Sequence, residues 1–270
     1  ARPEEFQSAF LKWKTKIGEG ALWRSLSLRG QETKGTELLQ SADGALTVKG
    51  ELPEKDTWIL TFDLPAGQPL TALRLDALTK KAGGKWKDKN VALRELTAEL
   101  FVDGEKSRKL RLTNPRADFS QKGWEVAKAI DGSTKAGWAF SPMAAAPHVA
   151  VFDFDQPVTG GQLRLTLEQE YGQGLIFENF KVSVSNLPPS WLEAEVDAKG
   201  GLESVFVTHV YGPTREMNVR LEAARTNLEQ VRRAIPQTPI MRELPVNRRR
   251  VTKVHRRGNF LDQGEMVSER

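Results

Sequence analysis

Short stretches of alternating or continuous apolar residues fill the middle of the chain and predict β-strands. Each stretch is bounded by Gly, Pro, Asn or Asp, and no long helical period separates them. The predicted strands cover residues 57–64, 70–78, 96–104, 107–114, 148–155, 161–169 and 180–186. Strands of this length and spacing are typical of a sandwich or jelly roll. The pattern therefore predicts a mainly β fold.

The N-terminal end of the chain carries a helical period instead. Phe6, Phe10, Trp13 and Ile17 recur at helical spacing. We therefore predict a helix over residues 1–18 that packs on another element.

The C-terminal part divides into a helical segment and a tail. Residues 188–236 are predicted to be helical, and Pro236 ends the last helix. An apolar stripe on that helix comprises Val219, Leu221, Ala224, Leu228 and Val231. The tail, 237–270, is rich in proline and arginine and is predicted to be extended. The sandwich would then occupy 19–187.

The two halves of the β region resemble each other. The stretches around Asp63 and Arg74 match those around Asp153 and Arg164 at one constant offset. The SADG stretch that ends at Gly44 matches the AIDG stretch that ends at Gly132 at a similar offset. Glu95 likewise matches Glu178, each ahead of a predicted strand. These offsets indicate an internal duplication, either one composite sandwich or two small ones, although chance similarity between strands is the alternative. We favour one body, because two domains of this size would each bury little apolar surface.

Composition excludes several classes of function. The chain has no cysteine, so it has no disulfide, thiol nucleophile or haem-attachment motif. No apolar run approaches the roughly 20 residues that a transmembrane helix needs. The net charge is +5, and a run of basic residues lies in 247–257. Because no aromatic residue, helix-turn-helix or zinc pattern accompanies this run, we do not predict nucleic-acid binding.

No catalytic pattern stands out. The chain has three histidines, far apart in sequence, and no metalloprotease, nucleophile-elbow or phosphate-loop motif. Glu168 and Glu170 would be the first candidates for a carboxylate pair, but residues two apart on a strand share a face and usually flank a loop. We therefore predict that the chain is not an enzyme.

Aromatic residues in predicted loops suggest a binding surface. Trp86, Trp124 and Tyr171 could stack on the apolar faces of sugars, while polar side chains fix orientation. Asn90 and His148 are further ligand-binding candidates; for His148 the alternative is a hydrogen-bonded structural role. The lysines around Trp86 favour an anionic polymer, with a solvated loop as the alternative.

The stretch AIDGSTKAGWAF, from Ala129 to Phe140, resembles a signature of discoidin-like, galactose-binding domains. In that pattern an Asp-Gly turn precedes a Trp that anchors a strand, here Trp138. The resemblance implies a galactose-binding-like sandwich and a structural Ca²⁺ held by Asp131, with Glu178 as the late acid. A turn without metal is the alternative.

Several longer stretches, in order, resemble large planctomycete-specific proteins of unknown function that often carry cytochrome c domains. They are WRSLSLRGQETKGTELLQSADGALTVKG (23–50), ADFSQKGWEVAKAIDGSTKAGWAFSPMAAAPHVAVFDFDQPV (117–158), LEQEYGQGLIFENFKVSVSNLPPS (167–190) and MRELPVNRRRVTKVHRRGNFLDQGEMV (241–267). Lys89 replaces a glycine of the family pattern, and the family's "GRFR" step is Glu178-Asn179-Phe180-Lys181 here. The resemblance implies an exported protein, periplasmic or at the cell surface, with neighbouring domains as partners and no haem in this chain.

Together these observations predict a non-catalytic module that binds a polysaccharide or another glycan, one that could be anionic. The alternative is a structural, protein–protein adaptor that links cytochrome c and other domains. An adaptor would expose its largest apolar patch on the helices, and a glycan-binding module would expose aromatic residues on loops.

Overall fold

The computed structural model describes most of the chain, and every structural statement below concerns these residues. They are 4–16, 22–78, 81–82, 85–86, 90–102, 107–192, 201–235, 248, 253–258 and 261–267, with only the backbone described at 81–82, 85–86 and 201.

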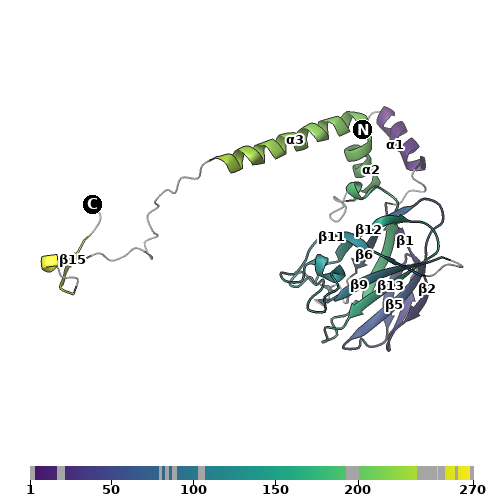
Figure 1. The fold of residues 1–270 in the computed structure, drawn as a ribbon, viewed down its shortest axis with the longest axis horizontal. Helices are drawn as coiled ribbons and strands as arrows, with labels where there is room; N and C mark the ends of the chain where they lie inside the picture. The colour runs from purple at the N-terminus through teal and green to yellow at the C-terminus, as the bar shows by residue number, and fades with distance from the viewer. Residues whose placement is uncertain are drawn as a thin grey trace. The chain divides into compact units, whose positions relative to one another are not determined.

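Two antiparallel sheets face each other across the core (Figure 1). In the described part of the chain, sheet A has the order β11-β12-β6-β14-β4-β3, with β1 also paired to β14. Its strands are β1 (Arg24–Ser25), β3 (Glu37–Gln40), β4 (Ala45–Lys49), β6 (Leu70–Ala77), β11 (Leu112–Ala117), β12 (His148–Val158) and β14 (Asn179–Ser185). Sheet B has the order β10-β9-β13-β5-β2. Its strands are β2 (Ser27–Glu32), β5 (Asp56–Asp63), β9 (Glu95–Phe101), β10 (Arg108–Leu110) and β13 (Gln162–Gln169). The predicted mainly β sandwich is confirmed at the level of fold class.

Side-chain alternation explains why these segments form half-buried strands. Along β13, Leu163, Leu165 and Leu167 are buried, and the residues between them face outward. Burial of the inward residues against the opposite sheet fixes the register, because a slip of one residue would expose every leucine.

The two sequence halves interlock in one body. In the first half, β5 and β9 lie in sheet B and β6 lies in sheet A. The second half has the opposite arrangement, with β12 and β14 in sheet A and β13 in sheet B. Strand β6 lies between β12 and β14, and β13 lies between β5 and β9. One core cluster contains residues from both halves, for example Trp58 and Phe180, whose rings stack at 5.4 Å.

The SADG and AIDG stretches are not equivalent in the fold. Asp43 lies in the turn between β3 and β4, where Gly44 has a φ of 87° and lies against Ser25. Asp131 instead follows the 3₁₀ helix η1 (Val126–Ile130). The repeat is therefore limited to the three strands that alternate between the sheets.

Helices cover part of the outer face of sheet A. Helix α1 (Glu4–Lys16) places Phe6, Phe10 and Trp13 against Phe206 and neighbouring rings. Trp13 also packs on a second apolar cluster that includes Ala72, Val151, Leu187, Leu192 and Val205. The N-terminal helix thus packs as its spacing predicted, while Ile17 lies outside the described residues. The other elements here are η2 (Pro189–Trp191), α2 (Gly201–Val205) and the π-helix η4 (Phe206–Val210).

The chain from residue 219 onward forms a separate compact unit. Helix α3 (Gly212–Ala234) runs into this unit and has no buried residue. The tail forms a hairpin of β15 (Lys253–His255) and β16 (Gln263–Met266) around η6 (Arg256–Gly258), rather than the purely extended segment that its prolines predicted. No helix of the described residues is both long and apolar enough to span a membrane.

Candidate functional site

Two cross-sheet connections meet at one end of the sandwich, which we call the loop end. One connection joins β6 to β9 and the other joins β13 to β14. Backbone hydrogen bonds join their flanks: the Ala92 amide donates to Leu175 O at 3.0 Å, and the Arg94 amide donates to Glu168 O at 2.8 Å. Segments far apart in sequence are therefore adjacent here.

Two of the predicted aromatic residues come together at the loop end. The rings of Trp124 and Tyr171 meet edge to face, with centroids 5.0 Å apart and an interplanar angle of 90°. Tyr171 is 52% exposed, whereas Trp124 is partly buried. Edge-to-face geometry is a favourable arrangement for aromatic pairs, so each ring restricts the other. This aromatic pair presents an ordered apolar surface to solvent.

Asn90 makes hydrogen bonds on both sides of the loop that carries Trp124, and its contact with a ligand stays a prediction. Its Nδ2 donates to Gln121 Oε1 at 3.2 Å, and its Oδ1 accepts the Phe140 amide at 3.0 Å. Gln121 pairs in turn with Trp124, whose carbonyl accepts the Ala139 amide. Asn90 thus has the role of positioning the loop that carries Trp124.

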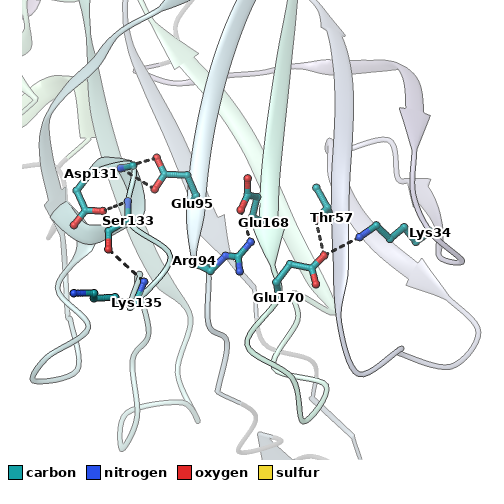
Figure 2. Close-up of polar contacts among 10 residues, drawn as sticks. Lys34, Thr57, Arg94, Glu95, Asp131, Ser133, Lys135, Glu168 and Glu170 are labelled. Atoms are coloured by element: carbon teal, nitrogen blue, oxygen red, sulfur yellow. Dashed lines mark hydrogen bonds and ion pairs between the residues drawn. The ribbon is translucent and has the colours of Figure 1, made fainter.

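A line of polar and charged side chains crosses the ends of β5, β13 and β9 (Figure 2). We call it the polar row, and it consists of Lys34, Thr57, Glu170, Glu168, Arg94, Glu95 and Asp131. Glu170 accepts hydrogen bonds from Thr57 Oγ1 at 2.7 Å and Lys34 Nζ at 3.0 Å. These donors hold the pKa of Glu170 below its usual range. Arg94 Nη2 donates to Glu168 Oε2 at 2.6 Å. The Nε of Arg94 is buried and has no acceptor among the described residues, so a water or ligand oxygen would satisfy it.

Glu95 and the Asp131 turn form the far end of the polar row (Figure 2). Both carboxylate oxygens of Glu95 accept the Gly132 amide, at 3.3 and 3.2 Å. Asp131 closes its own turn by accepting the Ser133 amide at 2.7 Å. Burial, and then the nearby charges of Asp131 and Glu168, raise the pKa of Glu95 to about 7.

A cleft of about 820 Å³ opens beside Glu95. Its walls include Glu95 and Thr97 of β9, Lys109 of β10, Asn114 of β11 and Asp131. The cleft therefore lies where β10, the edge strand of sheet B, meets β11, the edge strand of sheet A, and it reaches the polar row at Glu95.

The raised pKa of Glu95 predicts a pH dependence of stability. Because the folded state holds this proton more tightly than the unfolded state, the stabilisation is complete below the ordinary value of 4.5 and is lost as pH rises through about 7. The full shift would correspond to about 3 kcal/mol, and water in the open cleft screens it, so we expect about 1–2 kcal/mol. Urea denaturation of wild type and Glu95→Gln at about pH 5 and about pH 8.5 would measure it.

The difference between the two proteins is the quantity of interest, since other groups titrate in both. Wild type should lose stability relative to Glu95→Gln as pH rises, and Glu99→Gln, further along β9, should follow wild type. Parallel pH profiles for wild type and Glu95→Gln would contradict the assignment.

His148 is a core residue and does not lie on the surface of the loop end. Its side chain is 3% exposed, Nδ1 lies 3.0 Å from Asp118 Oδ2, and Nε2 lies 2.7 Å from Met143 O. Burial lowers the pKa of His148, but the bonds to Asp118 and Met143 O outweigh it, and the net change is upward. Both ring nitrogens of His148 already have hydrogen-bond partners. His148 therefore has the hydrogen-bonded structural role, and the prediction that it contacts a ligand directly is corrected.

The Trp86 side chain lies outside the described residues; its backbone pairs with Lys81 in a short hairpin of β7 (Lys81–Ala82) and β8 (Lys85–Trp86). Nothing in the described structure tests its binding role, which stays a prediction.

The calcium prediction gains no support from the geometry. In the described part of the chain no three His, Cys, Asp or Glu side chains come together as a metal-ion group. The acid beside Asp131 is Glu95 and not Glu178. Glu178 directly precedes β14, and its carbonyl oxygen accepts the Val48 amide. Asp131 closes a turn, as the metal-free alternative describes. Calcium stays a prediction, and no step below depends on it.

Comparisons with known proteins give fold similarities alone. No family model matches the chain, and no curated protein matches it. A solved structure of CBM32-3 from a family 31 glycoside hydrolase of Clostridium perfringens is similar with a TM-score of 0.31 and 12% identity, covering 61% of this chain and 90% of that one. A family 11 carbohydrate-binding module from Clostridium thermocellum, in complex with a β-1,3-1,4-mixed-linked tetrasaccharide, has a TM-score of 0.17 and 13% identity, covering 58% and 95%. TM-scores this low carry no argument about a ligand.

Proposed function

We propose that the loop end binds a glycan without catalysis, through the aromatic pair and the polar row. The observation that carries the proposal is the ordered contact between Trp124 and the exposed ring of Tyr171. An exposed aromatic ring that a second ring holds in place can stack on the C–H face of a pyranose with little loss of side-chain freedom.

The polar row supplies the hydrogen-bonding partners that a sugar needs. Glu170 directly precedes Tyr171, and its carboxylate is already oriented by Thr57 and Lys34. Arg94 and Glu168 hold each other beside it, at side-chain exposures of 26% and 31%. Carboxylates accept hydrogen bonds from hydroxyl groups, and a guanidinium donates to hydroxyl and ring oxygens. Orientation by neighbours reduces the entropy that binding would cost.

A neutral glycan fits the described charges better than an anionic one. The polar row holds the carboxylates of Glu95, Asp131, Glu168 and Glu170, and two of its cations, Lys34 and Arg94, are already paired with Glu170 and Glu168. An anionic chain would meet these acids. The lysines that suggested an anionic polymer lie largely in residues 80–89, whose side chains are outside the description.

The proposal is non-catalytic because each acid of the row has a structural partner. Glu95 holds the Gly132 amide, and Asp131 holds the Ser133 amide of the same turn. Glycoside hydrolysis needs one carboxylate to protonate the leaving group and a second that is available to act as a base or nucleophile. We expect no release of reducing ends from any polysaccharide that the chain binds, and hydrolysis lost in Glu95→Gln would contradict the non-catalytic proposal.

Replacing Tyr171 by alanine tests the binding site. Affinity electrophoresis against neutral polysaccharides would first identify a ligand, and calorimetric titration would then give Kd. We expect Tyr171→Ala to weaken binding about tenfold or more, or ~1.4 kcal/mol, because it removes the exposed stacking surface. Stability should hardly change, since Tyr171 is 52% exposed.

Two variants serve as controls. Tyr171→Phe keeps the ring and should keep most of the affinity. Gln162→Ala changes the far end of β13, the strand that leads into the Tyr171 loop, and should bind like wild type. Equal affinity of wild type and Tyr171→Ala, or equal losses for Gln162→Ala and Tyr171→Ala, would refute binding at the loop end.

Export to the periplasm or cell surface is part of the proposal and rests on the family resemblance. The two features that distinguish the glycan-binding module from the adaptor occur on different parts of the chain. Tyr171 is exposed on a loop, and α3 exposes apolar side chains. One chain can therefore combine glycan binding with protein docking.

A further inference from the structure

Helix α3 exposes apolar side chains along most of its length. Leu221, Leu228 and Val231 are 48%, 51% and 52% exposed, Ile235 directly after the helix is 58% exposed, and no residue of the helix is buried. Helices in proteins derive most of their stability from packing an apolar face, and α3 has no buried residue in the described structure. Its exposed apolar side chains are therefore available to a partner.

The spacing of these side chains specifies the kind of partner. Leu221, Ala224, Leu228, Val231 and Ile235 are separated by three, four, three and four residues. This is the a/d repeat of a coiled coil, which keeps a narrow apolar line facing a second helix. We call it the α3 seam. Val219, which the sequence pattern placed in the apolar stripe, lies off the seam, and Met217 precedes it in the same helix with matching spacing.

The residues that flank the seam are basic or neutral. The e and g positions hold Arg220, Arg225, Asn227, Arg232 and Ala234. The acids of this stretch, Glu222 and Glu229, lie at b positions and pair with Arg225 and Arg232 at 2.7 and 3.5 Å. Exposed pairs of this type contribute only a few tenths of a kcal/mol, so these arginines can exchange partners.

Charge at the flanks selects among the possible occupants. A second copy in parallel would place Arg220 opposite Arg225, and an antiparallel copy would place arginines at e opposite arginines at e. A lipid surface favours a wider apolar face than an a/d line. A helix with acidic e and g positions matches both the seam and its flanks.

We infer that the α3 seam docks an amphipathic helix of another protein or domain, with apolar a and d positions and acidic flanks. The complex would be a short heterotypic coiled coil. This surface is independent of the loop end, so its failure would leave the proposed glycan binding untouched.

Two synthetic peptides test the inference with the whole chain. Both have three heptads with leucine at a and d; the acidic probe has glutamate at e and g, and the basic probe has lysine there. Fluorescence anisotropy with labelled peptides gives the two dissociation constants. We expect the acidic probe to bind at least about tenfold more tightly than the basic one. Equal binding of the two probes, or no binding of either, would overturn the inference.

Variants separate the seam from the rest of the helix. Leu228→Asp should reduce acidic-probe binding about tenfold or more, while Val219→Asp, also exposed but off the seam, should keep it. Arg225→Glu combined with Arg232→Glu should transfer the preference to the basic probe. Equal losses for Leu228→Asp and Val219→Asp would contradict a seam.

The other occupants are direct outcomes of two further measurements. Sedimentation equilibrium of the wild type that shows a dimer dissociated by Leu228→Asp would replace the heterotypic partner with a second copy. Sedimentation of the wild type with phosphatidylcholine–phosphatidylserine vesicles that is lost in Leu228→Asp would show that the α3 seam binds a lipid surface instead of a helix. A monomer that does not sediment with vesicles supports the helical partner.

Discussion

Replacing Gly137 by alanine is expected to destabilise the protein by about 3 kcal/mol or more, because the position has no room for a Cβ. A Cβ added there would lie 2.0 Å from Leu93 O and 2.5 Å from Arg94 Cα, and both are backbone atoms that cannot rotate away. Relief would require separation of the Leu93–Trp138 bridge. That bridge has two hydrogen bonds, of 2.9 and 2.8 Å.

The consequences of Gly137→Ala extend to the candidate site. Leu93 precedes Arg94, and Trp138 precedes Ala139, whose amide donates to Trp124 O. Movement at the bridge would therefore displace both the polar row and the aromatic pair. We expect a lower urea midpoint together with weaker glycan binding in this one variant.

Gly30→Ala is the matched control for this substitution. A Cβ at Gly30 meets nothing within 4 Å, and the residue lies on the edge strand β2. Its unfolding free energy should stay within about 0.5 kcal/mol of wild type. A Gly137→Ala protein as stable as Gly30→Ala would show that the backbone at Leu93 shifts at little cost.

The sequence predicted those parts of the fold that depend on local alternation. The long strands β5, β6, β12 and β13 were recognised within a few residues, because their inward apolar side chains repeat at every second position. The strands before residue 50 were missed. They are short, and β2 has the sequence SLRGQE, which contains a single large apolar residue. Pairing with β5 makes this segment a strand, and pairing is not visible in composition.

The candidate site was only partly predictable for a related reason. Trp124 and Tyr171 were recognised individually as aromatic residues in loops, but their contact depends on the β11–β12 and β13–β14 connections meeting at one end. Glu95 was noted only as a repeat position. Its pKa is raised by burial and then by the charges of Asp131 and Glu168, and therefore by register and packing. The Glu168–Arg94 pair could have been suspected only once β9 was known to lie beside β13.

Replacing Asp153 by alanine should destabilise the protein by about 3–5 kcal/mol, because it would leave a largely buried arginine without its counter-charge. Asp153 accepts Arg116 Nη2 at 2.7 Å, Arg116 Nη1 at 3.0 Å and Asn114 Nδ2 at 2.9 Å. The side chains of Arg116 and Asp153 are 14% and 8% exposed. Urea denaturation of the variant and wild type at one pH would measure the loss.

The repeat supplies a matched control for this variant in Asp63, which aligns with Asp153 in sequence. Asp63 is exposed and accepts only a hydrogen bond from Gln162 Nε2, at 3.2 Å, among the described contacts. Asp63→Ala should therefore change stability by less than about 0.5 kcal/mol. Similar losses in both variants would mean that burial of the Arg116 pair is not what matters. A larger loss of stability in Asp153→Ala would show that Asp63 and Asp153, although aligned in the repeat, contribute differently to stability. Asn114 lies at the bulge in β11, where its φ is 46°, and it lines the cleft beside Glu95. Because Asp153 accepts hydrogen bonds from both Arg116 and Asn114, it also holds this wall of the cleft in place.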